Sequence, residues 1–314
     1  MQTTNYNFSL LRYLTTRLAY TIPVLWLVVS VVFLLIHLVP GDPIQQMLGE
    51  GAASADIQAA RHAYGLDVPI GQQYVNYWRG LLRGDMGQSL RFNQNVSRVI
   101  AERYPFTLEL TLAALAVAIL LSIPAGVRSA RRRNRWDDRA LSFVSLLGLS
   151  FPNFALGPVL ILFFAIKLGV LPVSGSGSLA HLVLPAITLG GALAAILTRM
   201  VRTAMLEELG QDYIRTARAK GLPERTVVYR HALRNAMIPV ITVLGLQFGA
   251  LLAGAIVTET IFSWPGIGRL TIQAIANRDY YLVQGCILAI GLTYVAANFL
   301  TDMLYSVFNP RIRQ

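Results

Sequence analysis

Residues that could do chemistry are few in this sequence, and their spacing argues against catalysis. The four histidines are scattered along the chain: His37, His62, His181 and His231. They lack the spacing of metal ligands, and no nucleophile is paired with a general base. The two lysines, Lys167 and Lys220, do not follow a glycine-rich loop, whereas a phosphate-binding P-loop needs such a lysine. The sequence therefore predicts a chain that is not an enzyme and holds no metal or cofactor, with any nucleotide hydrolysis left to a partner.

The composition indicates which environment surrounds these residues. Of 314 residues, 54% are hydrophobic and only 14% are charged, whereas soluble domains carry about a quarter charged residues. The net charge of +11 comes from basic residues that lie between long apolar runs. No basic stripe alternates with aromatic residues, so the pattern argues against nucleic acid as a partner. Membrane lipid is the expected surroundings, and the single Cys286 predicts no intrachain disulfide.

Six apolar runs are candidates for membrane-spanning helices, since about 20 apolar residues cross the hydrocarbon core. They are Leu18–Val39, Phe106–Val127, Leu141–Leu168, Leu182–Leu197, Met237–Val257 and Leu282–Leu300. The first run is too long for the apolar part of a signal peptide, so we expect it to be retained. The third run is too short for two crossings, and we expect one long, tilted or kinked helix there. The predicted fold class is an all-α integral membrane protein with six transmembrane helices.

Basic residues are concentrated in alternate connections between these runs. The connection between the second and third runs holds six arginines within twelve residues, and residues 199–236 hold eight basic side chains. The positive-inside rule then places both termini in the cytoplasm. The predicted organisation is a cytoplasmic arm (1–17), a first span (18–39), an extracytoplasmic segment (40–105), a membrane core (106–308) that contains a cytoplasmic loop (199–236), and a cytoplasmic tail (309–314).

The extracytoplasmic segment 40–105 has mixed polarity and turn signals. Gly41-Asp42-Pro43 follows the first span directly, which indicates a turn. Residues Ala52–Tyr64 and Gln72–Leu82 have helical patterns, and the second helix carries an apolar stripe formed by Tyr74, Tyr77, Trp78, Leu81 and Leu82. A helical cap on the outer face and a docking surface for a soluble partner both fit this pattern.

The loop 199–236 combines helical and stop signals. Leu206–Lys220 has helical composition, Gly221 and Pro223 supply a stop, and Arg225–Ala236 resumes as a helix that leads into the fifth span. Small side chains beside arginines let another protein approach closely and allow pairing with its carboxylates. An ordinary positive-inside loop explains the same residues equally well on spacing alone.

Polar residues within the apolar runs are candidates for a translocation path. Asn153, Gln247 and Asn298 either line a wet path or form interhelical hydrogen bonds. Gly245 and Gly249 form a pair of small residues four positions apart, which favours close helix packing.

A membrane protein with these features could also be a self-sufficient channel or a secondary transporter, which needs no partner subunits. Such proteins need ionisable residues deep within their spans. Here only His37, Glu109 and Lys167 fall within the runs, all near an edge, which argues against that class.

The loop 199–236 carries a resemblance that decides between its two interpretations. The stretch Asp212–Leu222, followed by His231–Ala236, resembles the cytoplasmic loop of ABC importer permeases, a Glu-Ala-Ala signature with a glycine further on. Ala217 and Gly221 match that signature, whereas Arg215 and Thr216 replace its Glu and first Ala, and Arg234 stands where the general form has Pro. These departures are similar to the dipeptide, oligopeptide, glutathione and nickel branch, in its first-permease, B-type form.

The resemblance extends over nearly the whole chain. Motifs that carry it occur in the order and spacing of the family: Pro40–Pro43, Tyr64–Asp67, Gly84–Leu90, Thr107–Leu110, Phe262–Arg269, Arg278–Tyr280 and Asn309–Arg313.

The resemblance implies a type I importer fold in a bacterial inner membrane and a set of partners. These are a homologous second permease, two ATP-binding subunits that hold ATP and Mg, and a soluble or lipid-anchored substrate-binding protein. The residues implied to couple to an ATP-binding subunit are Asp212, Tyr213, Arg215, Thr216, Ala217, Arg218, Ala219, Lys220 and Gly221. The implied cargo is a short peptide, a dipeptide, an oligopeptide or glutathione, with nickel complexes as the alternative.

Two outer segments are predicted to contact the substrate-binding protein. One is the uncharged loop that contains Gly175, Ser176 and Gly177, and the other contains Trp264 and Pro265.

Overall fold

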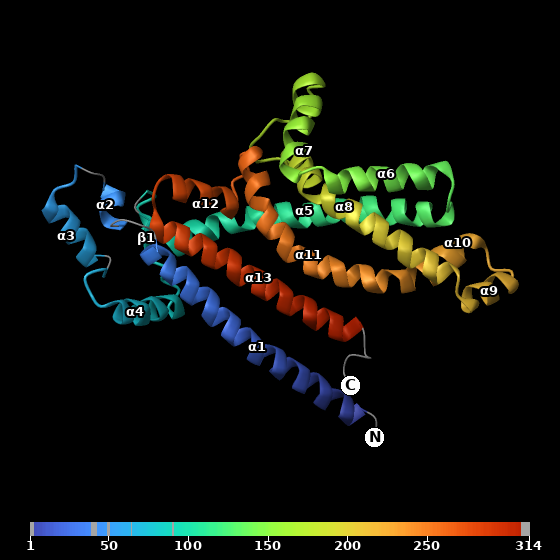
Figure 1. Ribbon diagram of the computed structural model, residues 1–314, viewed down its shortest axis with the longest axis horizontal. Helices are drawn as coiled ribbons and strands as arrows, with labels where there is room; N and C mark the ends of the chain where they lie inside the picture. The colour runs from blue at the N-terminus through green and yellow to red at the C-terminus, as the bar shows by residue number, and fades with distance from the viewer. Residues whose placement is uncertain (1–2, 39–42, 49–50, 64, 90, 309–314) are drawn as a thin grey trace.

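The computed structural model is an elongated bundle of long helices, with smaller elements gathered at its two ends (Figure 1). It describes residues 3–38, 43–48, 51–63, 65–89 and 91–308. The elements are α1 (Thr3–Leu38), α2 (Pro43–Leu48), α3 (Ser54–Ala63), α4 (Ile70–Leu82), β1 (Gln88–Ser89), β2 (Gln94–Asn95), α5 (Val96–Arg131), α6 (Trp136–Ser150), α7 (Asn153–Leu160), the π-helical η1 (Ile161–Lys167), α8 (Leu179–Leu209), α9 (Asp212–Ala219), α10 (Glu224–Thr226), the π-helical η2 (Val227–Ala232), α11 (Leu233–Ile261), α12 (Ile267–Ala276) and α13 (Tyr280–Phe308).

The six predicted apolar runs fall largely on helices and follow the predicted order, although Val39 lies outside the described residues. Within the described residues, four helices have the length and composition to cross a membrane: Val96–Arg131, Leu179–Leu209, Glu224–Leu252 and Tyr280–Thr301. The pair formed by α6 and α7–η1 passes the same test together, and α1 contributes the shorter apolar stretch Ala19–Leu34. The membrane boundaries themselves, such as 18–39 and 106–308, stay predictions.

The third run is not the single kinked helix that the sequence predicted. Its two halves meet at an angle of 111°. Phe151 and Pro152 have extended backbones, with ψ of 122° and 133°. Proline lacks an amide hydrogen and disfavours the helical conformation of the residue before it, so the helix ends at Ser150 and resumes at Asn153. A proline-centred break therefore replaces the predicted kink.

Glycines let α5 and α8 pack side by side along their length. A Cβ atom on Gly190 would lie 2.4 Å from the carbonyl oxygen of Ala114, and one on Gly126 would lie 2.6 Å from Cβ of Val201. Contacts this short leave no room for a side chain, so the backbones themselves define the interface. The α5–α8 pair forms the centre of the bundle.

A second glycine pair sets the contact between α11 and α13, as the sequence predicted. A Cβ on Gly245 would lie 2.2 Å from Cγ2 of Thr301, and one on Gly249 would lie 2.6 Å from Cδ2 of Tyr294. Helix α13 also packs along α1. Helices α1 and α13 run side by side in Figure 1. The prediction that this small-residue pair serves helix packing is therefore confirmed.

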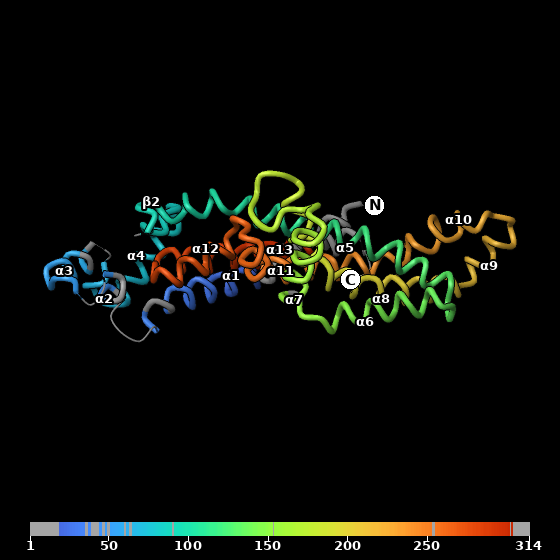
Figure 2. The backbone as a smooth tube through the Cα atoms, turned by 90° about the horizontal axis from the view of Figure 1, so that it is seen from above, coloured from blue at the N-terminus to red at the C-terminus, as the bar shows by residue number. Residues whose placement is uncertain are grey.

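The small elements divide between the two ends of the bundle. Helices α2, α3 and α4 lie at one end, and α9 and α10 lie at the other (Figure 2). The helices predicted over Ala52–Tyr64 and Gln72–Leu82 correspond to α3 and α4, although Tyr64 and the turn residues Gly41 and Asp42 lie outside the described residues.

Helix α4 packs against α1 and α13 through part of its predicted stripe. Tyr77, Trp78 and Leu81 contact buried residues of those two helices, whereas Leu82 is 82% exposed. Including Leu82 in the stripe was wrong: it follows Trp78 by about one helical turn, but as the last residue of α4 it is left exposed.

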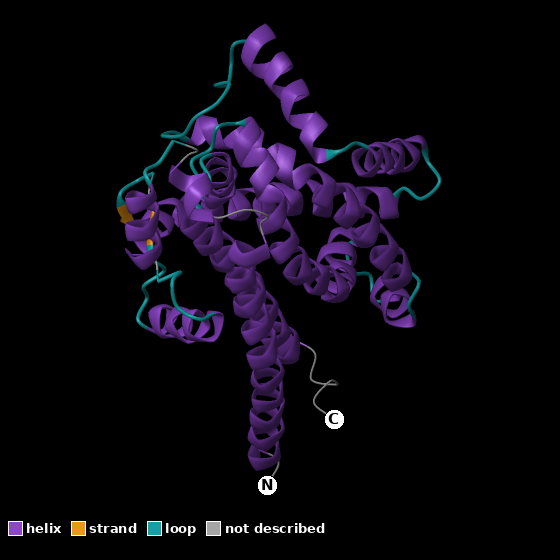
Figure 3. Ribbon diagram, turned by 60° about the vertical axis from the view of Figure 1, so that its left-hand side comes forward, coloured by secondary structure: helices purple, strands orange, loops and turns teal. Residues whose placement is uncertain are grey.

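Three short features at the same end have no counterpart in the sequence prediction: α2, α12 and the β1–β2 hairpin, whose strands are orange in Figure 3. In the hairpin, Gln88 pairs with Asn95 and Ser89 with Gln94 in antiparallel register. The buried carboxylate of Asp279 accepts hydrogen bonds from the Ser89 hydroxyl and the Arg91 amide. This acid holds the hairpin against the start of α13.

Candidate functional site

The predicted helix Leu206–Lys220 is interrupted, and the interruption creates α9 as a separate element. Helix α8 ends at Leu209, Gln211 has an extended backbone with ψ of 151°, and α9 begins at Asp212. Gly210 lies between the two helices, and glycine is a poor helix former because folding costs it the most backbone freedom. The sequence analysis did not predict this break. Because of it, α9 points in its own direction at the end of the bundle (Figure 1).

Helix α9 has one buried face that joins the main core. Ile214 is 0% exposed and Ala217 is 7% exposed. Both belong to the cluster that contains Val201 and Met205 of α8 and Val227 of η2. Sequence analysis included Ala217 in the coupling set and overlooked Ile214. The spacing of these two apolar residues, three positions apart in a polar helix, is the signal that could have identified this inner face.

The other residues of the predicted coupling set all lie on the exposed face or at the end of α9. They are Asp212, Tyr213, Arg215, Thr216, Arg218, Ala219, Lys220 and Gly221. This face carries three basic side chains, two methyl-bearing residues and an aromatic ring. Such a surface can contact an acidic, partly apolar cleft in another protein.

Side-chain hydrogen bonds fix both ends of α9. At its start, the Tyr213 hydroxyl donates to the Glu208 carboxylate and accepts a bond of 3.0 Å from the Asn235 amide. At its end, the Arg218 guanidinium donates to Glu224 at 2.9 and 3.2 Å. The Glu224 carboxylate raises the pKa of Arg218 through these bonds. Helix α9 is therefore tied to α8, α10 and α11.

Arg215 is held much less firmly than Arg218. It lies 3.3 Å from the Asp212 carboxylate, and the two side chains are 74% and 94% exposed. Exposed pairs of this kind contribute little to stability. The Arg215 guanidinium can therefore turn to a carboxylate on another protein at small cost.

Gly221 ends α9 in a Schellman motif, which confirms the predicted stop. Its amide donates to the carbonyl of Arg218 at 2.9 Å, and the amide of Leu222 donates to the carbonyl of Ala217 at 3.3 Å. The φ of Gly221 is +76°, a value that favours glycine. A Cβ atom at this position would meet no atom of the described residues within 4 Å.

At the opposite end, the two segments predicted to contact a binding protein lie together. The amide of Gly175 donates to the carbonyl of Phe262 at 2.9 Å. Ser176 and Gly177 are exposed, and Pro265 is half-buried. The side chain of Trp264 is only 2% exposed. Its indole N–H donates to the carbonyl of Phe106 at 2.8 Å and its ring meets the Phe106 ring edge-on. Trp264 therefore holds the loop to α5 from inside.

A buried acid near the same loop was overlooked by the sequence analysis. Glu259 is 0% exposed, and its carboxylate accepts hydrogen bonds from the Thr107 hydroxyl at 2.6 Å and the Arg269 amide at 3.0 Å. A Cβ on Gly266 would lie 2.1 Å from this carboxylate. The sequence analysis did not single out Glu259, and it named Glu109 instead, which is exposed.

Among the described residues, no hydrogen bond or ion pair joins the three candidates for a translocation path to one another. Gln247 on α11 and Asn298 on α13 are both half-buried. Asn298 lines a mainly apolar groove of about 600 Å³ between α1 and α13, to which Gly249 of α11 also contributes. Asn153 begins α7, and its side chain lies outside the described residues.

These features define a class: an all-α membrane protein of the permease type, with a small helix standing off one end of the bundle. The chain belongs to the family described as "Binding-protein-dependent transport system inner membrane component", whose model matches residues 122–314. A second model, described as "Binding-prot-dependent transport system membrane comp, N-term", matches residues 10–111.

Curated relatives match over nearly the full length. The glutathione transport system permease protein GsiC of Escherichia coli strain K12 is 43% identical over 304 residues, which cover 97% of this chain and 99% of that protein. The proteins of the same name from Shigella dysenteriae serotype 1 and Pectobacterium atrosepticum have the same identity and coverage.

Solved structures share the fold at much lower identity. Two inward-facing structures of the MetNI methionine ABC transporter match with TM-scores of 0.55 and 0.57. Each is 18% identical and covers 67% of this chain and 96% of its own.

Several predictions from the sequence are confirmed by these comparisons. The chain is an ABC importer permease with an all-α membrane fold, and it is a transport subunit and not an enzyme. The family works with ATP-binding subunits and other permease subunits in an inner membrane.

Proposed function

We propose that this chain is one of two homologous permease subunits of an ATP-driven importer for short peptides, with glutathione as the leading cargo. The observation that carries this proposal is the 43% identity over 97% of the chain to a glutathione transport system permease. Dipeptides and oligopeptides belong to the same chemical class, because they share the peptide backbone and the charged ends.

The proposed assembly has three further kinds of component. A homologous second permease completes the pore, and two ATP-binding subunits hold ATP and Mg. A soluble or lipid-anchored substrate-binding protein delivers the cargo, as the family description implies. The lack of a lysine after a glycine-rich loop in this chain fits hydrolysis in a partner, because such a loop binds the phosphates.

The end that carries α9 faces the cytoplasm in this proposal, together with both termini. The α5–α6 turn lies towards the same end as α9 in Figure 1. It carries three of the six arginines of residues 128–139, and the last turn of α5 carries two more. Basic residues are retained on the cytoplasmic side of inner-membrane proteins. Residues 40–105 and α12 then lie on the outer side, where Gly175–Gly177 and Pro265 are placed to contact the binding protein.

Helix α9 is the element that couples this chain to an ATP-binding subunit. Its exposed face, with Tyr213, Arg215 and Lys220, sits in a cleft of that subunit. Its inner face, with Ile214 at 0% exposure, transmits displacement to the core of α5 and α8. Nucleotide binding favours one of two states of the bundle, because the partner binds α9 differently in each state. Gln247, Asn298 and Asn153 are the proposed polar residues of the cargo path.

Reconstitution of the complete transporter tests this function. The chain would be placed in proteoliposomes with its second permease, the ATP-binding subunits and the binding protein. We expect glutathione to stimulate ATP hydrolysis and to enter the vesicles only when the binding protein is present. Uptake by this chain alone without nucleotide would overturn the proposal. Stimulation by nickel complexes and not by peptides would overturn the cargo.

Single cysteines test the orientation independently. The native Cys286 is fully buried, so an added cysteine at an exposed position reports on that position alone. We expect a membrane-impermeant maleimide added to spheroplasts to label Ser176→Cys and to leave Lys220→Cys unlabelled until the membrane is opened. The reverse pattern would overturn the orientation.

A further inference from the structure

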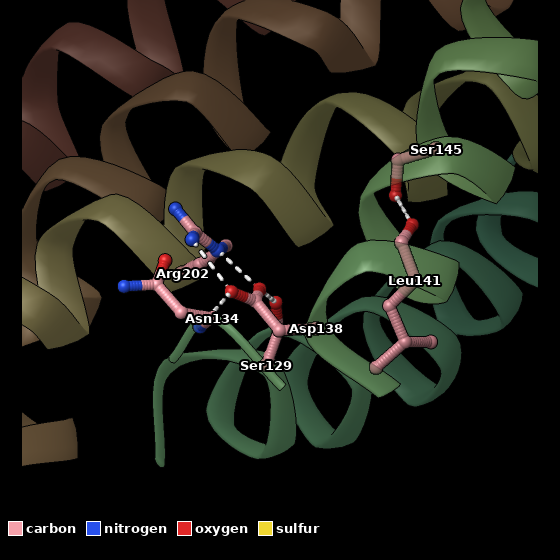
Figure 4. A network of polar contacts seen from close by, with 6 residues as sticks. All are labelled: Ser129, Asn134, Asp138, Leu141, Ser145 and Arg202. Carbon is pink, nitrogen blue, oxygen red and sulfur yellow. Dashed lines mark hydrogen bonds and ion pairs between the residues drawn. The ribbon is translucent and has the colours of Figure 1, made fainter. Parts of the chain in front are cut away.

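A buried ion pair joins α6 to α8 near the end of the bundle that carries α9. The guanidinium of Arg202 on α8 donates to both oxygens of Asp138 on α6, at 2.7 and 2.9 Å. Asp138 is only 3% exposed. Figure 4 shows the two side chains directed at one another from different helices. Paired hydrogen bonds of this kind fix orientation as well as distance.

Asp138 also gathers donors from two other parts of the chain. The Ser129 hydroxyl of α5 donates to one oxygen, and the backbone amide of Asn134 donates to the other at 2.9 Å. Asn134 has a φ of +65°, a conformation in which asparagine is tolerated. A single carboxylate therefore connects α5, the following turn, α6 and α8.

The neighbouring acid, Asp137, provides a natural contrast. It is also buried, at 4% exposure. Its ion pairs go to Arg132 at 2.8 Å and Arg128 at 3.4 Å, which lie directly after α5 and in its last turn. Asp137 thus joins the start of α6 to the end of α5, whereas Asp138 connects this α5–α6 hairpin to α8.

The position of the Asp138–Arg202 pair on α8 links it to α9. On α8, Val201 directly precedes Arg202, and Met205 follows it by three residues. Both are 0% exposed and pack in the same cluster as Ile214 of α9. The opposite face of α6 is uncovered in this chain, with Phe143 and Val144 exposed by 60% and 62%. A buried ion pair is not needed for stability, because apolar residues of similar size often serve as well. Its distinctive property is directional attachment.

We propose that Asp138 and Arg202 are positioning residues that make α6, and the bent segment α7–η1 after it, follow α8 and α9 during transport. This rests on the proposed function, in which an ATP-binding subunit displaces α9. Without the pair, α9 and α8 still move, but α6 no longer follows in register. The transporter then still hydrolyses ATP but carries less cargo per cycle.

Transport per ATP hydrolysed in the reconstituted transporter tests this role, with Asp138→Asn compared with Asp137→Asn. We expect Asp138→Asn to assemble with its partners and to lower cargo carried per ATP by about tenfold or more, as the loss of a charge-assisted bond implies. Arg202→Lys, which keeps the charge but loses the paired geometry, should lower the ratio by an intermediate amount. Asp137→Asn should keep it within about twofold. A normal ratio for Asp138→Asn, or an equal loss for Asp137→Asn, would overturn the proposal.

A distance measurement keeps the test independent of transport. Spin labels at the exposed positions Phe143 on α6 and Glu207 on α8 report how firmly the two helices are joined. We expect a narrow distance distribution in the parent chain and in Asp137→Asn, and a broader one in Asp138→Asn. An unchanged distribution in Asp138→Asn would refute the attachment. Absence of transport by the parent complex would instead refute the proposed function and leave this measurement valid.

Discussion

Gly221 offers the sharpest test of α9 as a contact with another subunit, because its surroundings within the chain are empty. Its φ of +76° lies in the left-handed region, where a residue with a Cβ atom costs about 1–2 kcal/mol. A Cβ atom would meet nothing within 4 Å in the part of the chain that the structure describes. Any further cost of a larger side chain must therefore come from something outside the chain.

Three substitutions separate these two costs. Gly221→Asn keeps a residue that tolerates the left-handed region, and Gly221→Ala adds the backbone cost alone, a factor of about 5 to 30 in the local equilibrium. Gly221→Arg has the same backbone cost as alanine and adds bulk at the end of α9. We expect the alanine variant to retain much of the uptake, and the arginine variant to lose at least a further factor of about ten while inserting normally.

The assay is binding-protein-dependent uptake in proteoliposomes, with co-purification of the ATP-binding subunits as the second measurement. If the arginine and alanine variants behave alike, no partner lies against Gly221 and the assignment of α9 fails. If the asparagine variant is as damaged as the arginine variant, Gly221 acts through another property than backbone conformation or bulk.

Three further predictions concern stability and protonation. Glu259→Gln should destabilise the chain by about 1–3 kcal/mol in thermal unfolding, because its amide would face hydrogen-bond donors, while the exposed Glu109→Gln should change it by less than about 0.5 kcal/mol. Gly190→Ala should destabilise by about 1–3 kcal/mol, because its Cβ would lie 2.4 Å from a backbone oxygen of α5, whereas Gly191→Ala meets only a leucine methyl at 3.4 Å and should be neutral. The hydrogen-bonded carboxylate of Asp67 raises the pKa of His62. The contribution of the His62–Asp67 pair to stability should therefore be complete below the ordinary imidazole pKa and disappear as pH rises through the raised value. An NMR titration checks this, and replacing the aspartate by asparagine should restore the ordinary pKa.

The long helices were predictable because their apolar runs exceed what a buried strand or loop would contain. Hydrophobic content does not reveal where such a helix breaks, and the bend at Pro152 was interpreted as a kink. The break at Gly210 was missed for a related reason, since the residues on either side have helical composition and glycine alone is weak evidence of an end. The short helix α12 follows the turn pair Pro265-Gly266 and has apolar residues at helical spacing, Ile267, Leu270 and Ala274, signals that the sequence analysis did not use.

The site residues were predictable from a motif and not from physics alone. The family motif located the exposed face of α9, but Ile214 was overlooked because attention went to the charged and small residues. The pairing of Asp138 with Arg202 spans 64 positions, and a single sequence holds no signal for such a contact. Glu259 shows the same limit, because a glutamate after an apolar run resembles a span boundary until the donors around it are known.

The bend between α6 and α7 determines what must surround this chain in its assembled state. The last four carbonyl groups of a helix have no partner within it, and acyl chains offer none, at a cost of several kcal/mol for each unsatisfied group. Phe151 and Phe154 beside the bend are exposed by 50% and 61% in the single chain. Lipid tails are therefore a poor neighbour for this stretch of backbone. Another subunit or a water-filled passage must lie against it.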